Sequence, residues 1–568
     1  MSRTRTGSLL GLLLLLPAAQ GADPPSPQWE ALFPAGAQQG STSTLTIIGG
    51  HFDSWPPATW TDGPDISLRP LEGKEEQQDI GESETDQGKI RQLEVEVQPD
   101  ARPGVRWLRL HDEKGVSSLR PFIVGTLPEV LEQEPNDSID EAQVLDLSAI
   151  VVNGRLEKKA DADSFAIHLK RGQTLVAHLV ANEILGSPMD GILQMSSRDG
   201  AILEQNHDTR GADPRLVFTA PSTDTFIVRC FAFPKRPSWI IGFDGAENYV
   251  YRLTLTTQGF VDHLYPPICG IAQPTKVEPK GWNIPEEARQ LQAAQAPSFD
   301  GEEVFHPDLG NTALLRRVSS PVFVEPLENE ERPPLICQVP CWIGGVIQEP
   351  EEVDVYEFDL AKDQTVNFRV NARSTGSPLD AVLEFYDPEG KHLERVDDIK
   401  GARDSALSYG IKVAGRYRLE IFDLHRRGGP RYVYALKAAQ KDPDFELSLG
   451  EKIFTLQAGS TIEVPVEIKR HDGFDGTIEI TATALPPGVT AAKAVSEAQG
   501  DSAGQVTLKL TTTKDGPRSS GSFRVIGTTT EPGAFTREVR SEFPRLIPPV
   551  PHLWLTVSAE EEKAPASS

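Results

Sequence analysis

The feature that most constrains the fold of this chain is an internal repeat. Gly186-Ser187-Pro188-Met189-Asp190 returns later as Gly376-Ser377-Pro378-Leu379-Asp380. Further matches keep the same order: Gly172-Gln173-Thr174 with Asp363-Gln364-Thr365, Asp199-Gly200 with Glu389-Gly390, Asp208-Thr209-Arg210-Gly211 with Asp398-Ile399-Lys400-Gly401, and Tyr249-Val250-Tyr251 with Tyr432-Val433-Tyr434. So many ordered matches predict two copies of one domain. We call residues 128–257 the first repeat and residues 329–439 the second repeat.

The repeated unit has the pattern of a β-sandwich. Short segments rich in branched and aromatic residues recur about every ten residues and are separated by turns such as Arg198-Asp199-Gly200. The strand candidates of the first repeat are Ser164–Leu169, Thr174–Val180, Gly191–Met195, Arg215–Phe218, Thr225–Phe231 and Tyr249–Leu255. With 47 Gly and 46 Pro in 568 residues, the chain has many turns and few places for long helices. We therefore predict an all-β protein of tandem sandwiches, jelly-roll-like in the repeats and Ig-like outside them.

Three further regions complete the predicted organisation. Residues 24–125, the N-terminal unit, alternate in Leu93–Val97 and Arg106–Leu110 like half-buried strands and carry an acidic loop at Glu72–Gln87. Residues 262–328, the middle segment, contain Pro267-x-Cys269-Gly270 and Gly281-Trp282-Asn283, which echo the N-terminal unit as a degenerate copy of it. The same segment has a possible short helix at Pro285–Gln295, and stretches at 296–311 and 325–334 are typical of acidic linkers. Residues 443–558, the C-terminal unit, alternate again, and 559–568 form a tail that we expect to be disordered.

The N-terminus and the net charge limit location and partners. Arg3 and Arg5 precede the apolar run Leu9–Leu16 and the small residues 17–21, which is the form of a signal peptide over residues 1–21. We expect export to the periplasm or outside the cell, with no insertion in the membrane, because no later stretch is apolar enough to span it. A net charge of −27 argues against nucleic acid as a partner.

The cysteines are too few for a disulfide framework. The chain has four, Cys230, Cys269, Cys337 and Cys341. Export permits disulfides, so Cys337 and Cys341 could close a small loop, but independent buried thiols explain the sequence equally well.

An acidic leader opens the first repeat. It reads Glu132-x-Glu134-Pro135-Asn136-Asp137-Ser138, and Asp161-x-Asp163 follows before the next strand. Six oxygen-bearing side chains at these positions suit Ca²⁺, which takes six to eight oxygen ligands. The alternative is a solvated Asx turn made by Asn136 and Asp137.

Together with Gly172-Gln173 and the two Gly-Ser-Pro-x-Asp turns, this leader resembles the bacterial pre-peptidase C-terminal domain family. The resemblance implies a small jelly-roll-like sandwich of the kind attached to secreted peptidases and other exported proteins. It also implies a calcium site whose ligands would be Glu132, Glu134, Asn136, Asp137, Asp161 and Asp163. The second repeat departs from this pattern, since its leader is Glu325-Pro326-Leu327-Glu328-Asn329-Glu330 and only Asp354 clearly answers Asp163. One site is therefore predicted. In the N-terminal unit, the run from Phe33 to Gly50 resembles IPT/TIG domains.

Each repeat has one basic loop, which precedes its last strand. One contains Lys235, Arg236 and Trp239, and the other contains Arg426 and Arg427. They could form a ligand rim, because guanidinium groups bind carboxylate or sulfate and Trp239 offers a stacking face. The alternative is that these charges serve solubility.

A possible catalytic motif occurs in the C-terminal unit. Gly500-Asp501-Ser502-Ala503-Gly504 fits the GxSxG pattern of serine hydrolases, which places the serine between a strand and a helix. Here a strand follows Ser502 and no helix is evident, so we predict a hairpin loop and no enzyme.

These features predict an exported, non-catalytic protein that binds extracellular or cell-surface polymers, either polysaccharide or protein, with a structural calcium ion in the first repeat. The alternative is an accessory or processed component of a secreted serine-peptidase system, since domains of the resembling family travel with peptidases.

Overall fold

The computed structural model describes residues 27–50, 57–71, 91–112, 115–146, 148–209, 211–234, 242–271, 275–289, 291, 302–327, 334–397, 404–440, 443–529, 535–540 and 552–558. The predicted signal peptide, the loop Glu72–Gln87 and the tail 559–568 lie outside these residues. Nearly all the secondary structure that is described consists of strands, which confirms the all-β, tandem-sandwich prediction.

The two repeats share one strand order. The strands of the first repeat are β10 (Glu129–Leu131), β11 (Gln143–Leu145), β12 (Ala149–Arg155), β13 (Asp163–Leu169), β14 (Thr174–Val180), β15 (Gly191–Ser197), β16 (Ile202–Asn206), β17 (Arg215–Thr219), β18 (Asp224–Ala232) and β19 (Val250–Thr256). They form two facing sheets, β10-β12-β19-β14-β17 and β11-β13-β18-β15-β16.

The strands of the second repeat are β25 (Val322–Val324), β26 (Leu335–Cys337), β27 (Cys341–Val346), β28 (Asp354–Leu360), β29 (Thr365–Asn371), β30 (Ala381–Tyr386), β31 (His392–Val396), β32 (Ala406–Gly410), β33 (Gly415–Asp423) and β34 (Val433–Gln440). Their sheets run β25-β27-β34-β29-β32 and β26-β28-β33-β30-β31, which is the order of the first repeat, strand for strand. The duplication read from the sequence is confirmed.

The Gly-Ser-Pro-x-Asp turns occupy equivalent places. Gly186 ends the short helix α1 (Asn182–Leu185), and Gly376 ends the 3₁₀ turn η3 (Arg373–Thr375). Both glycines have left-handed backbone conformations, with φ of 67° and 91°, which residues other than glycine rarely adopt. The repeated motif is therefore a helix-ending turn.

Each repeat has its own hydrophobic core between its sheets. Large side chains of both sheets fill the two cores; among the fully buried ones are Phe165 and Tyr251 in the first and Phe358 and Phe368 in the second. Burial of this apolar surface is the main source of stability for each sandwich.

The N-terminal and C-terminal units are also built from two sheets each. The N-terminal strands are β1 (Gln28–Phe33), β2 (Gly36–Gln38), β3 (Thr42–Gly50), β4 (Ala58–Thr61), β5 (Ile66–Pro70), β6 (Arg91–Val97), β7 (Gly104–Asp112), β8 (Gly115–Val116) and β9 (Arg120–Gly125). Their sheets are β1-β3-β6-β5 and β2-β9-β7-β4, with β8 paired to β7.

The C-terminal strands are β35 (Asp444–Ser448), β36 (Ile453–Gln457), β37 (Thr461–His471), β38 (Ile478–Thr483), β39 (Val489–Ala492), β40 (Ala494–Ser496), β41 (Gln505–Thr512), β42 (Ser519–Thr529), β43 (Phe535–Glu538) and β44 (Leu553–Ser558). One sheet is β35-β37-β41-β39, and the other is β36-β44-β42-β38-β40 with β43 paired to β42. Strict alternation of exposed and buried residues along β41 shows the period of two expected of a strand with one face in the core.

The middle segment is more structured than the sequence suggested. It holds the hairpin β20 (Phe260–Tyr265)–β22 (Glu278–Trp282) and a sheet of β21 (Ile268–Gly270), β24 (Ala313–Val318) and β23 (Glu302–Val304). Two of our expectations need correction. Strand β23 lies in the stretch 296–311, which we assigned to a linker, and β25 belongs to the second repeat, which therefore begins before residue 329. Three-residue strands are too short to show a periodic pattern in the sequence.

The helix expected at Pro285–Gln295 is also wrong within the described residues. Only the 3₁₀ turn η2 (Glu286–Ala288) forms there. After it, the Leu291 N–H donates to the Val277 carbonyl (3.0 Å), so Leu291 forms an antiparallel bridge with Val277 in place of a helical hydrogen bond.

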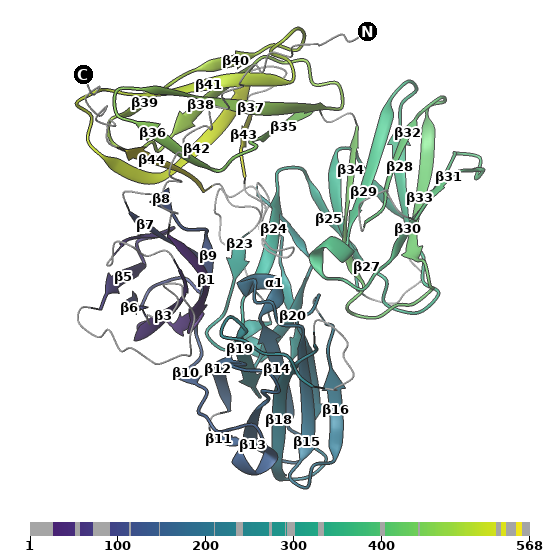
Figure 1. Cartoon of the computed structure of the whole chain (residues 1–568). Helices are drawn as coiled ribbons and strands as arrows, with labels where there is room; N and C mark the ends of the chain where they lie inside the picture. Colours follow the sequence, from purple (N-terminus) through teal and green to yellow (C-terminus); the bar gives the residue numbers. More distant parts are fainter. Residues whose placement is uncertain are drawn as a thin grey trace, which may run out of the picture.

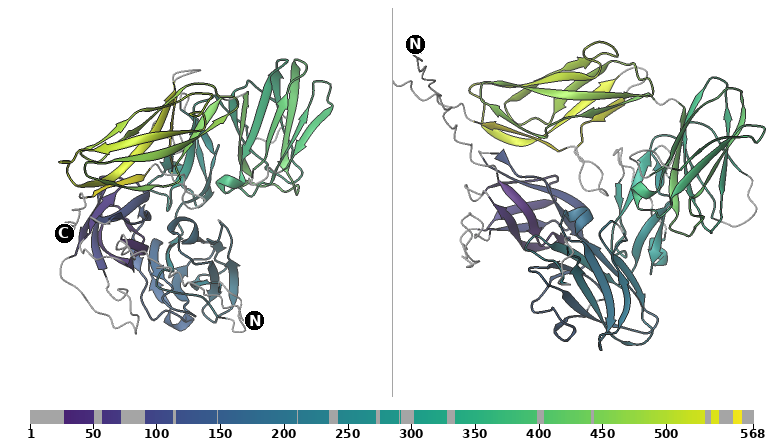
Figure 2. Two further views of the ribbon diagram at one scale, coloured as in Figure 1. Left: turned by 45° about the horizontal axis from the view of Figure 1, so that its top comes forward. Right: turned by 45° about the vertical axis from the view of Figure 1, so that its right-hand side comes forward.

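The five parts form a closed arrangement in which the first and last units touch (Figures 1 and 2). Trp554 of β44 is buried against the N-terminal unit, with Trp60 and His111 at ring distances of 6.1 and 5.0 Å. The Arg109 guanidinium lies over the same indole at 5.5 Å and donates to the His552 carbonyl (3.3 Å).

Among the described residues, no helix is both long and apolar enough to cross a membrane. The four cysteines are buried free thiols.

Candidate metal centre

The leader of the first repeat is fastened to both sheets of its sandwich. β10 pairs in parallel with β12, and the Glu132 N–H extends this ladder by donating to the Asn153 carbonyl (3.0 Å). The chain then crosses to the other sheet, where β11 pairs in parallel with β13. On the way, the Asn136 carbonyl accepts a hydrogen bond from the Ser164 N–H (3.0 Å). This crossing brings the leader beside the start of β13.

Three carboxylates meet at this crossing. Oxygens of Glu134, Asp161 and Asp163 all lie within 4.8 Å of one another, and this is the one such group of acidic, His or Cys side chains in the described part of the chain. Glu134 comes from the leader, Asp161 from the turn before β13, and Asp163 from the first position of β13. The two aspartates are fully buried, whereas Glu134 is exposed.

Several polar atoms at this place are buried without a hydrogen-bond partner. They are Oδ1 and Nδ2 of Asn136, Oδ1 of Asp161 and Oδ1 of Asp163. Leaving such a group unsatisfied costs about 1–3 kcal/mol, so a native protein rarely leaves several together. A cation coordinated by the three oxygens would satisfy them, whereas the Asn136 amide nitrogen is a donor and would need an acceptor of its own.

The pKa values show the same imbalance. Burial raises the pKa of Asp163 to about 7 and the pKa of Asp161 to about 6. Burial also raises the pKa of Glu132, and the Asp163 carboxylate adds to the rise. A divalent cation would reverse these shifts, because its charge stabilises ionised carboxylates. Carboxylate and amide oxygens are the ligands of Ca²⁺, so the residues fit the ion that the family resemblance implies.

The remaining predicted ligands have supporting positions. Glu132 Oε1 accepts a hydrogen bond from the Arg155 N–H (2.7 Å). Asp137 Oδ1 accepts one from the Ala162 N–H (3.4 Å), and its other oxygen lies 3.7 Å from Lys158 Nζ. Both acids thus fix the backbone around the three-carboxylate group.

One participant was not among the predicted residues. Tyr251, fully buried on β19, donates its hydroxyl to Asp163 Oδ2 (2.5 Å) and lies 3.2 Å from Glu132 Oε2. In the sequence Tyr251 was used only to align the two repeats. Its recurrence as Tyr434 was the one sequence feature that could have pointed to a role for it.

The second repeat keeps the centre of this arrangement and loses its outer acid. Because β25 pairs with β27 as β10 pairs with β12, Glu325 stands at the place of Glu132 and Leu327 at the place of Glu134. Tyr434 donates to Asp354 Oδ2 (2.5 Å), as Tyr251 does to Asp163. The counterparts of Asn136 and Asp137, residues 329 and 330, lie outside the described residues.

A second tyrosine joins the group in this repeat. Tyr356 occupies the position of Phe165, and its hydroxyl lies 2.5 Å from that of Tyr434. Tyr434 and Tyr356 are almost completely buried. Tyr434 thus donates to Asp354, and the Glu325 and Glu352 carboxylates lie near enough to act on it. Among the described residues, however, these acids do not converge as Glu134, Asp161 and Asp163 do in the first repeat.

The basic loops are only partly described. Lys235, Arg236 and Trp239 lie outside the described residues. In the second repeat, the Arg426 guanidinium stacks over the Phe422 ring at 3.9 Å, and Arg427 Nε lies 3.6 Å from Asp423 Oδ2.

The GxSxG motif is a turn between two strands. Ser502 lies between β40 and β41, and its Oγ accepts a hydrogen bond from the Glu497 N–H (3.0 Å). A nucleophile elbow needs a helix after the serine, whereas a strand follows here.

Comparisons with known proteins give no family. No protein-family model and no curated protein matches the chain. Among solved structures, the pre-peptidase C-terminal domain of a Bacillus anthracis collagenase matches with 14% identity and a TM-score of 0.17, over 20% of this chain and 99% of that domain. Tripeptidyl peptidase 2 matches with 8% identity and a TM-score of 0.15, over 94% of this chain.

A Clostridium perfringens ZmpB structure, which contains an M60 catalytic domain with two CBM51 domains, matches with 9% identity and a TM-score of 0.14, over 70% of this chain. The chain spans 40% of the tripeptidyl peptidase structure and 54% of the ZmpB structure. At these TM-scores the likenesses carry no argument, and the case for function stands on the site.

Proposed function

We propose that this chain is an exported, non-catalytic protein whose sandwiches bind extracellular or cell-surface polymers, and that a Ca²⁺ ion stabilises its first repeat. The convergence of Glu134, Asp161 and Asp163 beside the unsatisfied Asn136 side chain carries the calcium proposal. These side chains come from the leader, from the turn before β13 and from the start of β13, so one ion would join the leader to that strand.

The ion would act on structure. The leader supplies β10 and β11, which form edges of the two sheets. Without a cation, carboxylates at this range repel one another, and the leader is the segment that can move away. With the ion bound, both edges of the sandwich would be fixed, as suits a protein outside the cell.

The polymer-binding proposal has separate support. The loop after β33 presents Arg426 on an aromatic ring and Arg427 in solvent. Guanidinium groups in a fixed geometry suit the carboxylates or sulfates of an acidic polysaccharide. Nothing in this proposal requires catalysis.

Melting of the full chain in Ca²⁺ and in EDTA tests the calcium proposal. Extracellular calcium modules bind at about 10⁻⁴–10⁻³ M, and a ten-fold excess over Kd then adds about 1.4 kcal/mol. We expect the transition of the first repeat to move up by several degrees in millimolar Ca²⁺. Glu134→Gln should remove most of this shift.

The matched control is Glu204→Gln, which changes an exposed carboxylate of β16 in the same repeat. It should keep the calcium shift in full. Equal melting of the wild-type chain in Ca²⁺ and EDTA would contradict the proposal and leave the leader as a solvated turn.

A further inference from the structure

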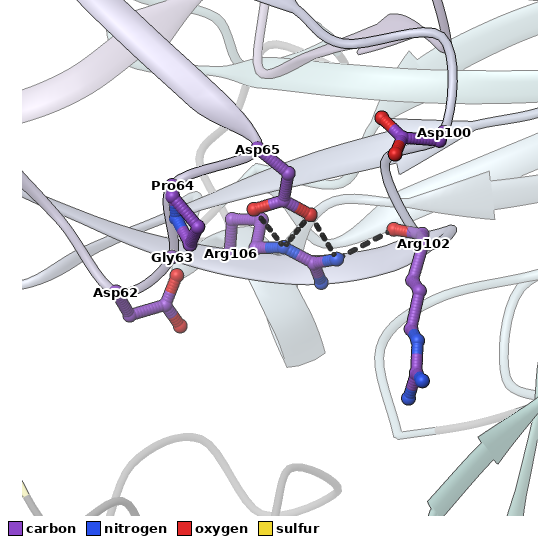
Figure 3. A pocket seen from close by; sticks show the side chains of 7 residues that line it. All are labelled: Asp62, Gly63, Pro64, Asp65, Asp100, Arg102 and Arg106. Carbon is purple, nitrogen blue, oxygen red and sulfur yellow. Dashed lines mark hydrogen bonds and ion pairs between the residues drawn. The ribbon is translucent and has the colours of Figure 1, made fainter.

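The N-terminal unit has a pocket that is separate from the metal centre. Its volume is about 460 Å³, and it opens between the turn that follows β4 and the loop that precedes β7 (Figure 3). The residues that line it are Asp62, Gly63, Pro64, Asp65, Asp100, Arg102 and Arg106. Three carboxylates and two guanidinium groups therefore face this space.

One ion pair forms a fixed wall of the pocket. Arg106 Nη2 lies 2.8 Å from Asp65 Oδ2, and Arg106 Nε donates to the same oxygen at 3.2 Å. Nη2 also donates to the Arg102 carbonyl (2.7 Å), and Nη1 donates to the Val105 carbonyl (3.2 Å). Each nitrogen of the Arg106 guanidinium is thus engaged, and Arg106 cannot turn toward another acid without breaking these bonds.

Of the three acids, only Asp65 forms an ion pair among the described residues, and Asp62 is more buried than Asp100. In Figure 3 its carboxylate lies apart from the Asp65–Arg106 pair. Its Oδ1 is buried without a hydrogen-bond partner. Burial raises the pKa of Asp62 to about 6, against the smaller opposing effects of the Trp107 backbone and the Arg106 charge. Near pH 7 the group is ionised and poorly compensated, a state that a bound cation would relieve.

We propose that this pocket binds an ammonium or guanidinium group on an alkyl chain, the chemistry of lysine and arginine side chains, with Asp62 as its counter-ion. The volume falls in the range of small-ligand sites, about 300–1,000 Å³. Once Asp65 and Arg106 neutralise each other, Asp62 and Asp100 outnumber Arg102, so the lining favours a cation. The acids of this pocket do not converge as those of the metal centre do, which favours an organic cation over a metal ion.

Saturation-transfer NMR on the full chain tests the proposal, with n-butylammonium and methylguanidinium as probes and 1-butanol as the uncharged match. We expect transfer to both cations and none to 1-butanol. Asp62→Asn keeps the shape of the side chain and should abolish the transfer, while Asp100→Asn should retain it. Equal transfer in Asp62→Asn, or to 1-butanol, would overturn the proposal.

The pH dependence gives a second readout. Asp65, Asp100, Arg102 and Arg106 face Asp62 from the surrounding turn, loop and strand, and the arginines stay charged throughout. With a pKa of about 6 for Asp62, affinity should fall roughly ten-fold from pH 7 to pH 5, as the carboxylate takes up a proton. Affinity that does not change over this range would overturn the assignment to Asp62.

A capped Gly-Lys-Gly peptide separates two sources of the cation. Binding of both the peptide and n-butylammonium would support the proposal and indicate a lysine side chain of another polypeptide. Binding of the free amine alone would support it and indicate a small soluble amine.

Discussion

A tyrosine at the same position of each repeat donates a hydrogen bond to a buried aspartate, but the surroundings of that aspartate differ between the repeats. Tyr251 donates to Asp163 beside a third carboxylate, whereas Tyr434 donates to Asp354 beside Tyr356. In the first repeat, three carboxylates lie within 4.8 Å of one another, and a cation there is our proposal. In the second repeat, burial and the Glu325 carboxylate raise the pKa of Asp354 well above its usual value, so a proton can neutralise the pair.

The second repeat should therefore lose stability as the pH rises. The folded pKa of Asp354 lies well above the value of 3.8 expected when unfolded, so the folded state holds a proton that the unfolded state releases. Stability is full below the unfolded pKa and falls as the pH rises toward the folded pKa, by up to about 1.4 kcal/mol per pH unit. Protection factors of β28 and β34 amides, measured in EDTA between pH 5 and pH 8, check this.

The control for this experiment is Asp354→Asn, which cannot titrate. Its protection factors should start lower, because an amide replaces the acid at a buried site, and should stay level across the same pH range. A wild-type slope that persists in Asp354→Asn would assign the effect to other groups.

The acids that the structure brings together could be singled out in the sequence, because they occur in two short clusters of oxygen-bearing residues. The three that converge, Glu134, Asp161 and Asp163, belong to those clusters. Tyr251 could not be predicted as a participant. It lies on β19, which the strand order places next to β12, and only this arrangement brings the Tyr251 hydroxyl to Asp163. Local spacing carries no information on that contact.

At the scale of elements, the loop after β33 is held by one buried acid. Asp423 accepts hydrogen bonds from the backbone N–H groups of Asp380, His425 and Arg427, all at 3.0 Å. These bonds fix a turn in which Arg426 takes a left-handed conformation, with φ of 56°. The Arg426 side chain is thereby directed onto Phe422. The hydrogen bonds to Asp423 therefore hold the loop in a conformation that positions Arg426.

Replacing Arg426 and Arg427 together by alanine should weaken retention on an acidic polysaccharide such as heparin, because these two groups carry the proposed ionic contacts. Elution should occur at lower salt, with the melting temperature nearly unchanged, since exposed charges contribute little to stability. Arg416→Ala is the control. Arg416 is an exposed arginine of β33, the strand that precedes the loop, and it pairs with Asp359. Equal retention of both variants would return the loop to a role in solubility.

Elements were predictable where they were long and regular. The strand candidates of the first repeat match β13, β14, β15, β17, β18 and β19 within a few residues. Edge strands of three residues, such as β10, β11 and β25, were not predicted, because they are strands only through their pairing with a neighbouring strand. The region around Pro285 failed for a related reason, since the bond from Leu291 to Val277 overrides local helix preference.

At the scale of the whole molecule, one buried acid joins three parts of the chain. Asp262 of β20 pairs with Arg215 of the first repeat and with Arg431 of the second repeat, the latter at 2.7 Å. The side chains of Asp262 and Arg215 are only 5% and 3% exposed. Burial works to raise the pKa of Asp262, but His263 and the two arginines together hold it well below its usual range. This junction ties both repeats to the middle segment.

Asp262→Asn should loosen that junction. Removing one partner of a buried ion pair costs about 3–5 kcal/mol, since it leaves the other charge uncompensated. Small-angle scattering should show a larger radius of gyration. In the wild-type chain, the contribution of Asp262 is present above about pH 4 and is lost as the pH falls toward its lowered pKa.

Asp359→Asn breaks an exposed pair with Arg416 and serves as the control, because solvent screens such a pair and its loss should leave the stability nearly unchanged. A radius of gyration that is the same for Asp262→Asn and the wild-type chain would show that other contacts hold the repeats in place.

The burial of Trp554 against the N-terminal unit has a consequence for a broken chain. Because the first and last units touch, the two halves of the molecule are connected by more than the backbone between the repeats. A protease that cut this backbone would release neither half, since the tryptophan contact and the Asp262 junction would still hold them together. Two fragments made separately should likewise find each other and assemble.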